Sequence, residues 1–92
     1  MKYRVEKSFS RDIDKIKDKK ILQKLRECIL KIEIAENILR VLHVKKIEGF
    51  DTFYRIKIGD YRLGMELLER NEIILMRFLH RKEIYRYYPK GK

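Results

Sequence analysis

Four side chains of the sequence have the chemistry that cleavage of a phosphodiester requires, namely Arg62, Lys57, His80 and Tyr85. Cationic groups stabilise the extra negative charge that develops on a phosphorane-like transition state. An imidazole titrates near neutral pH and can move a proton, and a phenol can do so where cationic neighbours lower its pKa. We therefore treat these four as candidate catalytic residues, with the proton-transfer role open between the histidine and the tyrosine.

Strand periodicity indicates how the cationic residues come together. Apolar and polar side chains alternate in residues 53–58 and again in residues 61–68. Successive side chains of a strand point to opposite faces, so Arg55 and Lys57 share one face, away from the tyrosine and isoleucines between them. Arg62 starts the next strand on that same side. The pattern predicts a basic surface on the face of a sheet that no helix covers.

Further cationic side chains extend this predicted surface. Arginine forks bind phosphate oxygens in pairs, which suits a nucleic-acid backbone. Tyrosines near the C-terminus would form a rim on which unpaired bases stack, at about 1–3 kcal/mol per base. The candidate RNA-binding residues are Arg55, Arg77, Arg81 and Lys46, and the rim tyrosines are Tyr85, Tyr87 and Tyr88.

Each of these residues also has a plain structural interpretation. Arg55 and Lys57 fit the solvated face of a half-buried strand. Arg62 has the spacing to pair with Glu66, and His80 fits a strand end with no proton to move. The adjacent tyrosines near the C-terminus fit a packing role. Residue types alone leave these alternatives open.

Other catalytic templates are missing from the sequence. The four glycines are scattered, so no glycine-rich phosphate loop is present. The two histidines, His43 and His80, lack metal-ligand spacing, and the single cysteine, Cys28, excludes a multi-cysteine zinc site within one chain. We therefore expect no metal and no cofactor.

The elements that must position these residues follow from hydrophobic periodicity. Apolar residues at helical spacing predict a helix over residues 20–42, with Cys28 on or beside its apolar stripe as a buried, inert thiol. Residues 3–7 fit a short strand. Ser8 or Ser10 is the predicted N-cap of a short helix, with Asp12 in its first turn.

From Val44 onward the period changes to two, which predicts strands at 44–47, 53–58, 61–68 and 73–79. Short turns at Gly59-Asp60 and Arg70-Asn71 join the last three as an antiparallel meander. Residues 80–88 fit a short helical turn that Pro89 ends. The fold class is α+β, with an N-terminal helical hairpin on one face of an antiparallel sheet.

Length and charge bound the function. The 92 residues suit one small domain, 1–92, and 24 basic against 14 acidic side chains give a net charge of +10. Such a charge is typical of nucleic-acid binders, although a charged thermophile surface is the alternative. No apolar run is long enough for a membrane span or a signal peptide, so we expect no membrane partner and a cytoplasmic location.

Three segments resemble the RelE/ParE toxin superfamily, and more closely its RelE branch. The resemblance covers nearly the whole chain, since Tyr3-Arg4-Val5 and Ser10-Arg11-Asp12-Ile13 also fit the family's opening strand and helix start. The segments are Lys46-Ile47-Glu48-Gly49, Tyr54-Arg55-Ile56-Lys57-Ile58-Gly59-Asp60-Tyr61-Arg62-Leu63 and His80-Arg81-Lys82-Glu83-Ile84-Tyr85.

This resemblance implies a helix hairpin on a curved antiparallel sheet and a metal-independent endoribonuclease. Such toxins of type II toxin–antitoxin systems cleave messenger RNA in the ribosomal A site, which would leave a 2′,3′-cyclic phosphate. The implied partners are the ribosome, messenger RNA and a RelB-like antitoxin that is acidic and partly helical. Operator DNA would be bound only through the antitoxin complex.

By the same resemblance, the family's strand cations correspond to Arg55 and Lys57, its YR arginine to Arg62 and its C-terminal tyrosine to Tyr85. The family arginine late in the last strand falls at Leu79, with Arg77 and Arg81 as neighbours and His80 where relatives carry a histidine or a basic residue. The resemblance leaves two alternatives open: a ParE-like toxin that inhibits DNA gyrase by binding, and an inactive basic module that acts only with its antitoxin.

Overall fold

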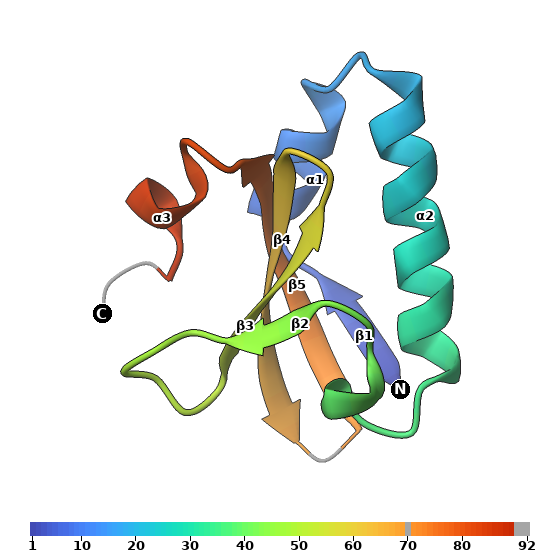
Figure 1. Cartoon of the computed structure of the whole chain (residues 1–92), viewed down its shortest axis with the longest axis vertical. Coiled ribbons are helices and arrows are strands. Elements are labelled where there is room, and N and C mark those ends of the chain that lie inside the picture. Colours follow the sequence, from blue (N-terminus) through green and yellow to red (C-terminus); the bar gives the residue numbers. More distant parts are fainter. Residues whose placement is uncertain (70, 90–92) are drawn as a thin grey trace.

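The computed structural model describes residues 1–69 and 71–89, and its helices lie against a mixed sheet (Figure 1). In chain order the elements are β1 (Lys2–Val5), α1 (Lys7–Asp14), α2 (Lys19–Ile34), the 3-10 turn η1 (Ile38–Arg40), β2 (Val44–Lys46), β3 (Phe53–Ile58), β4 (Tyr61–Glu69), β5 (Glu72–His80) and α3 (Ile84–Tyr87).

The sheet has the strand order β1-β5-β4-β3-β2 in the described part of the chain. The strands from β2 to β5 pair antiparallel, as predicted, but β1 pairs with β5 in parallel. Between them, α1 and α2 carry the chain from β1, at one edge of the sheet, to β2 at the other. The sheet is therefore mixed, and the expectation of a wholly antiparallel sheet was wrong for β1.

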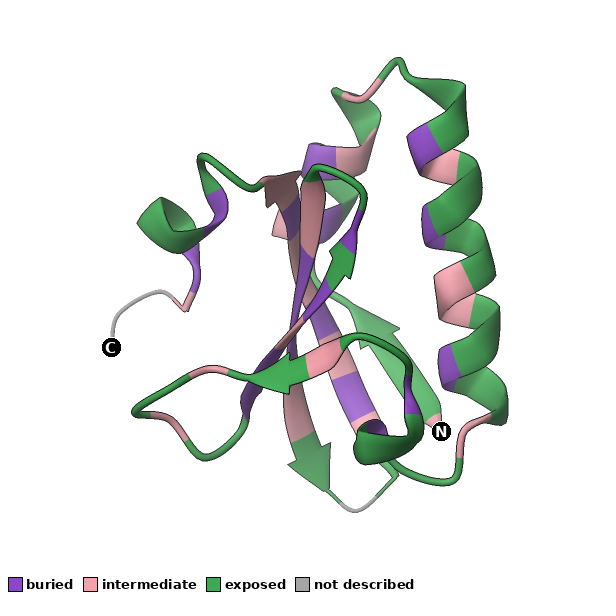
Figure 2. Ribbon diagram, in the orientation of Figure 1, coloured by how far each residue is buried: buried purple, intermediate pink, exposed green. Residues whose placement is uncertain are grey.

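The strands stand between α2 on one side and α3 on the other (Figure 1). The face toward α1 and α2 carries the main core, and Figure 2 shows buried positions in purple along the strands and along α2. Leu25 and Ile32 of α2 pack there with Ile56, Leu63 and Leu75 of the sheet, each at most 3% exposed. Burying side chains of this kind stabilises the fold by about 1.5–3 kcal/mol each.

Local signals explain where α2 begins and ends. The Asp18 carboxylate accepts bonds from the backbone N–H groups of Lys20 and Ile21, which caps the first turn. At Ala35 the backbone turns extended, and the Asn37 side chain caps η1 instead. The prediction of one helix over residues 20–42 was therefore wrong beyond residue 34, because its final leucines belong to a turn and lie exposed.

The first elements also differ slightly from their prediction. The first strand ends at Val5, and Glu6 occupies the N-cap of α1 without a side-chain cap, so neither serine has that role. Asp12 consequently falls in the second half of α1, where it is buried. Of the predicted turn at Arg70-Asn71, the arginine lies outside the described residues.

The face of the sheet away from α1 and α2 carries a smaller cluster built from Phe53, Ile84 and Tyr88. Gly64 of β4 makes this packing possible, because a Cβ on it would lie 2.7–2.9 Å from the Tyr88 ring. The Tyr88 hydroxyl donates to the carbonyl oxygens of Tyr54, at 2.8 Å, and Met65. Tyr88 thus fixes the end of α3 on β3 and β4.

We expect the substitution Gly64→Ala to lower the free energy of unfolding by about 1–3 kcal/mol, because the added methyl group overlaps the Tyr88 ring. Urea denaturation of the purified protein measures this change. In a Tyr88→Ala background the same substitution should be neutral or slightly stabilising, since the ring is gone and alanine restricts the unfolded chain. Equal destabilisation in both backgrounds would contradict this account.

Candidate functional site

The cationic side chains of β3 and β4 share the face that α3 partly covers. The register sets Lys57 directly opposite Arg62 and Arg55 directly opposite Gly64. Paired residues of neighbouring strands point to the same side, and Arg55 lies two positions from Lys57 on one strand. These three cations therefore gather on one face, as strand alternation predicted.

Hydrogen bonds to the hairpin turn hold the Arg62 guanidinium. Its Nη1 atom donates to the carbonyl oxygens of Gly59, at 3.0 Å, and Tyr61, at 2.9 Å. Its Nε and Nη2 atoms make no hydrogen bond within the described residues. That edge of the guanidinium is the fork that binds two oxygens of a phosphate. The predicted alternative, a pair with Glu66, does not form: Arg62 donates to the turn, and Glu66 accepts from the Thr52 hydroxyl.

A cavity of about 650 Å³ adjoins Arg55, one of these strand cations. Its lining includes Arg55 from β3, Lys45 and Lys46 from β2 and Tyr85 from α3. Tyr85 is 58% exposed, so its phenol is open to a ligand in the cavity. The lining has more positive than negative charge, with Glu48 as the acidic member. This arrangement suits a ribose–phosphate chain with a base against the phenol.

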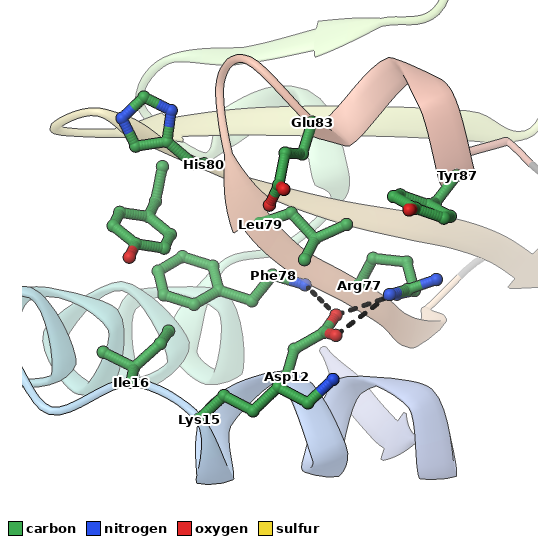
Figure 3. A pocket seen from close by; sticks show the side chains of 10 residues that line it. Asp12, Lys15, Ile16, Arg77, Phe78, Leu79, His80, Glu83 and Tyr87 are labelled. Atoms are coloured by element: carbon green, nitrogen blue, oxygen red, sulfur yellow. Dashed lines mark hydrogen bonds and ion pairs between the residues drawn. The ribbon is translucent and has the colours of Figure 1, made fainter.

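Arg77 and His80 line a different cavity, of about 430 Å³, at the edge of β5 between α1 and α3 (Figure 3). Arg77 donates from Nε and Nη2 to the two carboxylate oxygens of Asp12, at 2.8 and 3.0 Å. The same carboxylate accepts from the backbone N–H of Phe78 at 2.9 Å. The bond to Asp12 raises the pKa of Arg77, so the guanidinium remains charged.

His80 lies on the α1 side of the sheet end, apart from the strand cations. Its ring meets Tyr61 edge-on at 5.6 Å between centroids, and its Nδ1 accepts from the Lys82 backbone N–H at 3.2 Å. Arg81 borders the β3–β4 turn, where its Nε lies 3.8 Å from the exposed Asp60 carboxylate. Exposed pairs of this kind contribute little to stability.

The structure thus divides the predicted site residues. The register places Arg55, Lys57 and Arg62 on the α3 face, and Arg55 shares a cavity with Lys46 and Tyr85. Lys46 pairs with Tyr54, and Lys57 also lines the cavity beside Cys28 of α2, so neither is confined to the α3 side. Arg81 lies at the β3–β4 turn, and Arg77 and His80 line the cavity between α1 and α3. Arg77 has the expected backbone parity, opposite Gly64, but its side chain reaches around the edge to Asp12. The expectation of one continuous basic face was therefore wrong for these two residues.

Sequence reasoning missed Lys45 and Asp12. Strand alternation could have found Lys45, since β2 pairs it with Arg55. No local signal marks Asp12 as the partner of Arg77, because the two residues are 65 positions apart. Among the described residues no group of three or more His, Cys, Asp or Glu side chains is placed to hold a metal ion. Within the same residues no helix is long and apolar enough to cross a membrane.

Comparison with known proteins adds to this geometry. The family described as ParE toxin of type II toxin–antitoxin system, parDE, matches residues 3–85. The chain belongs to this family. It is therefore a member of the RelE/ParE toxin superfamily, as its motifs indicated.

The relatives of this ParE-family chain include proteins that carry RelE names. It is 50% identical over 48 residues to Toxin RelE3 of Methanocaldococcus jannaschii, a match that spans 52% of this chain and 53%, about half, of that curated relative. The solved RelB-RelE antitoxin-toxin complex from Methanococcus jannaschii has a chain that is 32% identical, with a TM-score of 0.78, covering 94% of this chain and 99% of that one.

A RelE-RelB complex from Pyrococcus horikoshii shares the fold of this family member. Its matching chain has a TM-score of 0.70 at 17% identity, and the match covers 90% of this chain and 97% of that one. The helix hairpin, the sheet and the short C-terminal helix are therefore a RelE-like fold.

Cys28 of this family member lies on α2 beside Lys31, in a cavity that also includes His43. Burial raises the pKa of the thiol to about 11, although nearby Lys31 acts in the opposite direction. The predicted inert thiol is therefore consistent with the structure, since the thiolate is the reactive form.

At pH 8 we expect alkylation of Cys28 by iodoacetamide to be roughly a hundredfold slower than alkylation of an unburied cysteine, because so little thiolate forms. The rate should keep rising until the pH approaches the raised pKa. The urea-unfolded chain is the control and should react at the ordinary rate. A plateau of the folded protein's rate below pH 9 would contradict the raised pKa.

Proposed function

We propose that this chain is the toxin of a type II toxin–antitoxin system and acts as a ribosome-dependent endoribonuclease that cleaves messenger RNA in the A site. One observation carries the proposal: the β3–β4 register sets Lys57 opposite Arg62, with Arg55 alongside them. A binding site for a protein surface does not require cations to stand directly opposite one another. A scissile phosphate is stabilised by cations that converge on it, because charge develops on its oxygens. The RelE-named relatives support the same assignment.

In the proposed reaction the ribose 2′-hydroxyl attacks the adjacent phosphorus, and the bond to the 5′-oxygen breaks. The products are a 2′,3′-cyclic phosphate and a 5′-hydroxyl, so the 2′-hydroxyl loses one proton and the 5′-oxygen gains one. Arg62, with its open Nε–Nη2 edge, and Lys57 would stabilise the phosphorane charge. The reaction uses the RNA's own hydroxyl as nucleophile and needs no metal ion.

The placement of the remaining residues favours particular roles. Tyr85 shares a cavity with Arg55 and Lys46, so it is the proton-transfer residue that the geometry supports best. Arg55 and Lys46 would orient the RNA backbone there, and Arg81 would extend the contact at the hairpin turn. His80 lies on the other side of the sheet end and therefore has a weaker claim to a proton-transfer role.

We further propose that an acidic, partly helical antitoxin is the partner. An apolar strip, defined here as Tyr3, Leu30, Ile34 and Leu42, supports this proposal: Leu30 and Ile34 lie one helical turn apart and are 56% and 84% exposed. Tyr3 and Leu30 line a cavity of about 330 Å³, and Ile34 and Leu42 line another of about 420 Å³. Exposed aliphatic groups arranged in this way are typical of protein-binding surfaces.

Charge favours an acidic occupant of the strip over a second copy of this chain. Two copies would each carry a net charge of +10 and repel, whereas an acidic segment is attracted. The RelE chain of Methanococcus jannaschii was solved as a complex with its RelB antitoxin, which supports the same kind of partner here. The strip lies over β1, α2 and the turn that holds Leu42, and Leu42 also lines a cavity with Lys57.

We expect Arg62→Ala to abolish growth arrest on expression and to reduce cleavage of ribosome-bound messenger RNA by about a hundredfold or more, because a stabilising donor is lost. Mapping 5′ ends on translated messages measures cleavage. Arg11→Ala, at an exposed arginine of α1, is the matched control and should cleave normally.

The same mapping separates the alternative functions. Intact messages with double-strand DNA breaks would indicate a ParE-like gyrase inhibitor, the alternative that the match to the ParE toxin family supports. Absence of both growth arrest and cleavage in the wild-type chain would indicate an inactive basic module. Equal growth arrest from Arg62→Ala and wild type would remove Arg62 from the mechanism.

For the partner, we expect Ile34→Glu to weaken binding of the antitoxin at least tenfold without lowering the melting temperature, since the Ile34 side chain is almost wholly exposed. Titration calorimetry with the short acidic protein expected from the neighbouring reading frame measures this. Leu68→Glu, at an exposed leucine of β4, is the control and should bind normally. A wild-type homodimer that Ile34→Glu dissociates would instead assign the strip to a second copy.

A further inference from the structure

Arg77 lies between elements that come from opposite ends of the chain. On one side its guanidinium donates two hydrogen bonds to the carboxylate of Asp12 in α1, whose side chain is 4% exposed. On the other side its Cζ atom lies 5.3 Å from the centre of the Tyr87 ring of α3 (Figure 3). Because Asp12 also accepts from the Phe78 backbone, its carboxylate is fixed to β5 itself.

The helix α3 depends on side-chain anchors for its orientation. It has 4 residues, a single turn, and so short a helix has no stability of its own. Ile84, fully buried, and Tyr88, 2% exposed, hold one side of it on the sheet. Two anchors on one side still allow the turn to rotate about the line that joins them. The contact of Tyr87 with Arg77 is a third anchor on a different side.

This third anchor bears on Tyr85, which belongs to the same turn. Tyr85 points toward the cavity that holds Arg55, while Tyr87 lies over Arg77 at the β5 edge. A rotation of α3 that breaks the Tyr87 contact would also move the Tyr85 phenol relative to the strand cations. Displacements of about 1 Å at a reacting group reduce rates by up to a hundredfold.

The bonds of Arg77 favour a structural contact over RNA binding. Its Nε and Nη2 atoms, the edge that forks onto phosphate, are both occupied by Asp12. Its side chain is 22% exposed, so it is largely withdrawn from a ligand on the sheet face. A charge-assisted, two-point pair fixes the plane of the guanidinium, and an aromatic ring stacks best on a plane that does not move.

We propose that Arg77 is a positioning residue: fixed by Asp12, it holds Tyr87 and thereby sets the rotation of α3 that presents Tyr85 to Arg55 and its neighbouring cations. The importance of Tyr85 rests on the proposed function, whereas the mechanical coupling between Arg77 and α3 does not. Arg77 acts through Tyr87 and touches no reacting atom.

The test uses Tyr87, because its side chain is 43% exposed and its replacement should not unfold the protein. In Tyr87→Leu we expect hydrogen exchange of the Tyr88 backbone amide, which donates to Ile84, to rise about three- to tenfold, with an unchanged melting temperature. Message cleavage should fall about tenfold in kcat. Tyr87→Phe keeps the aromatic ring over Arg77, so its Tyr88 amide exchange and its kcat should both match those of the wild type.

Leu39→Ala is the control, since it removes another exposed apolar side chain from η1, and it should leave exchange at Tyr88 and kcat unchanged. Wild-type exchange in Tyr87→Leu would overturn the coupling. Loss of cleavage in Tyr87→Phe equal to that in Tyr87→Leu would also overturn it, because the hydroxyl would then act directly.

The exchange measurement needs no RNA, so the two proposals fail separately. If the wild-type chain cleaves no message, the proposed function fails while the exchange in Tyr87→Leu still decides the coupling. As a second variant we expect Asp12→Asn to raise the Tyr88 exchange as Tyr87→Leu does, even where it also lowers the melting temperature. In the double variant Asp12→Asn/Tyr87→Leu, the Tyr88 amide should exchange no faster than in Tyr87→Leu, once the rates are corrected for the change in global stability. Additive increases from the two substitutions would overturn the coupling.

Discussion

The pairing of β3 with β4 sets Lys57 directly opposite Arg62, and the candidate site depends on this arrangement. Like charges opposite one another destabilise a sheet by up to about 1 kcal/mol, so the pair is not explained by the stability of the protein alone. A bound phosphate would neutralise the repulsion. The β3–β4 turn keeps the pair in register, since Gly59 adopts a positive φ of 59° and its carbonyl holds the Arg62 guanidinium.

The same face of the sheet must also support a helix, and the two uses are separated along the strands. Near Lys57 and Arg62 the face carries cations, whereas around Gly64 it accepts the Tyr88 ring and the cluster with Phe53 and Ile84. Leu79 lies opposite Arg62 and packs on that cluster, which joins the two parts. Without a side chain at Gly64, α3 can approach closely enough for Tyr85 to reach the cavity that holds Arg55.

Much of this arrangement was predictable because alternation along a strand is a local property. The spacing of Arg55, Lys57 and Arg62 was sufficient to place them on one face, and the Gly59-Asp60 turn was sufficient to join their strands. The helix over residues 20–42 was overextended for a related reason: its last leucines keep helical spacing, although Asn37 caps a separate turn and Leu39 lies 76% exposed. Periodicity reports which residues share a face but not whether another element covers it.

The sequence by itself determined the α+β class, the strand meander, the charge and the cations that gather on β3 and β4, because each follows from residue types a few positions apart. Only the tertiary structure decided that β1 joins β5 in parallel, that Asp12 occupies the guanidinium of Arg77, and that His80 faces away from the strand cations. The first two outcomes depend on contacts between residues 65 or more positions apart, which form only when the chain has folded and which no local pattern reveals. The orientation of His80 follows from its pairing with Tyr61 on β4.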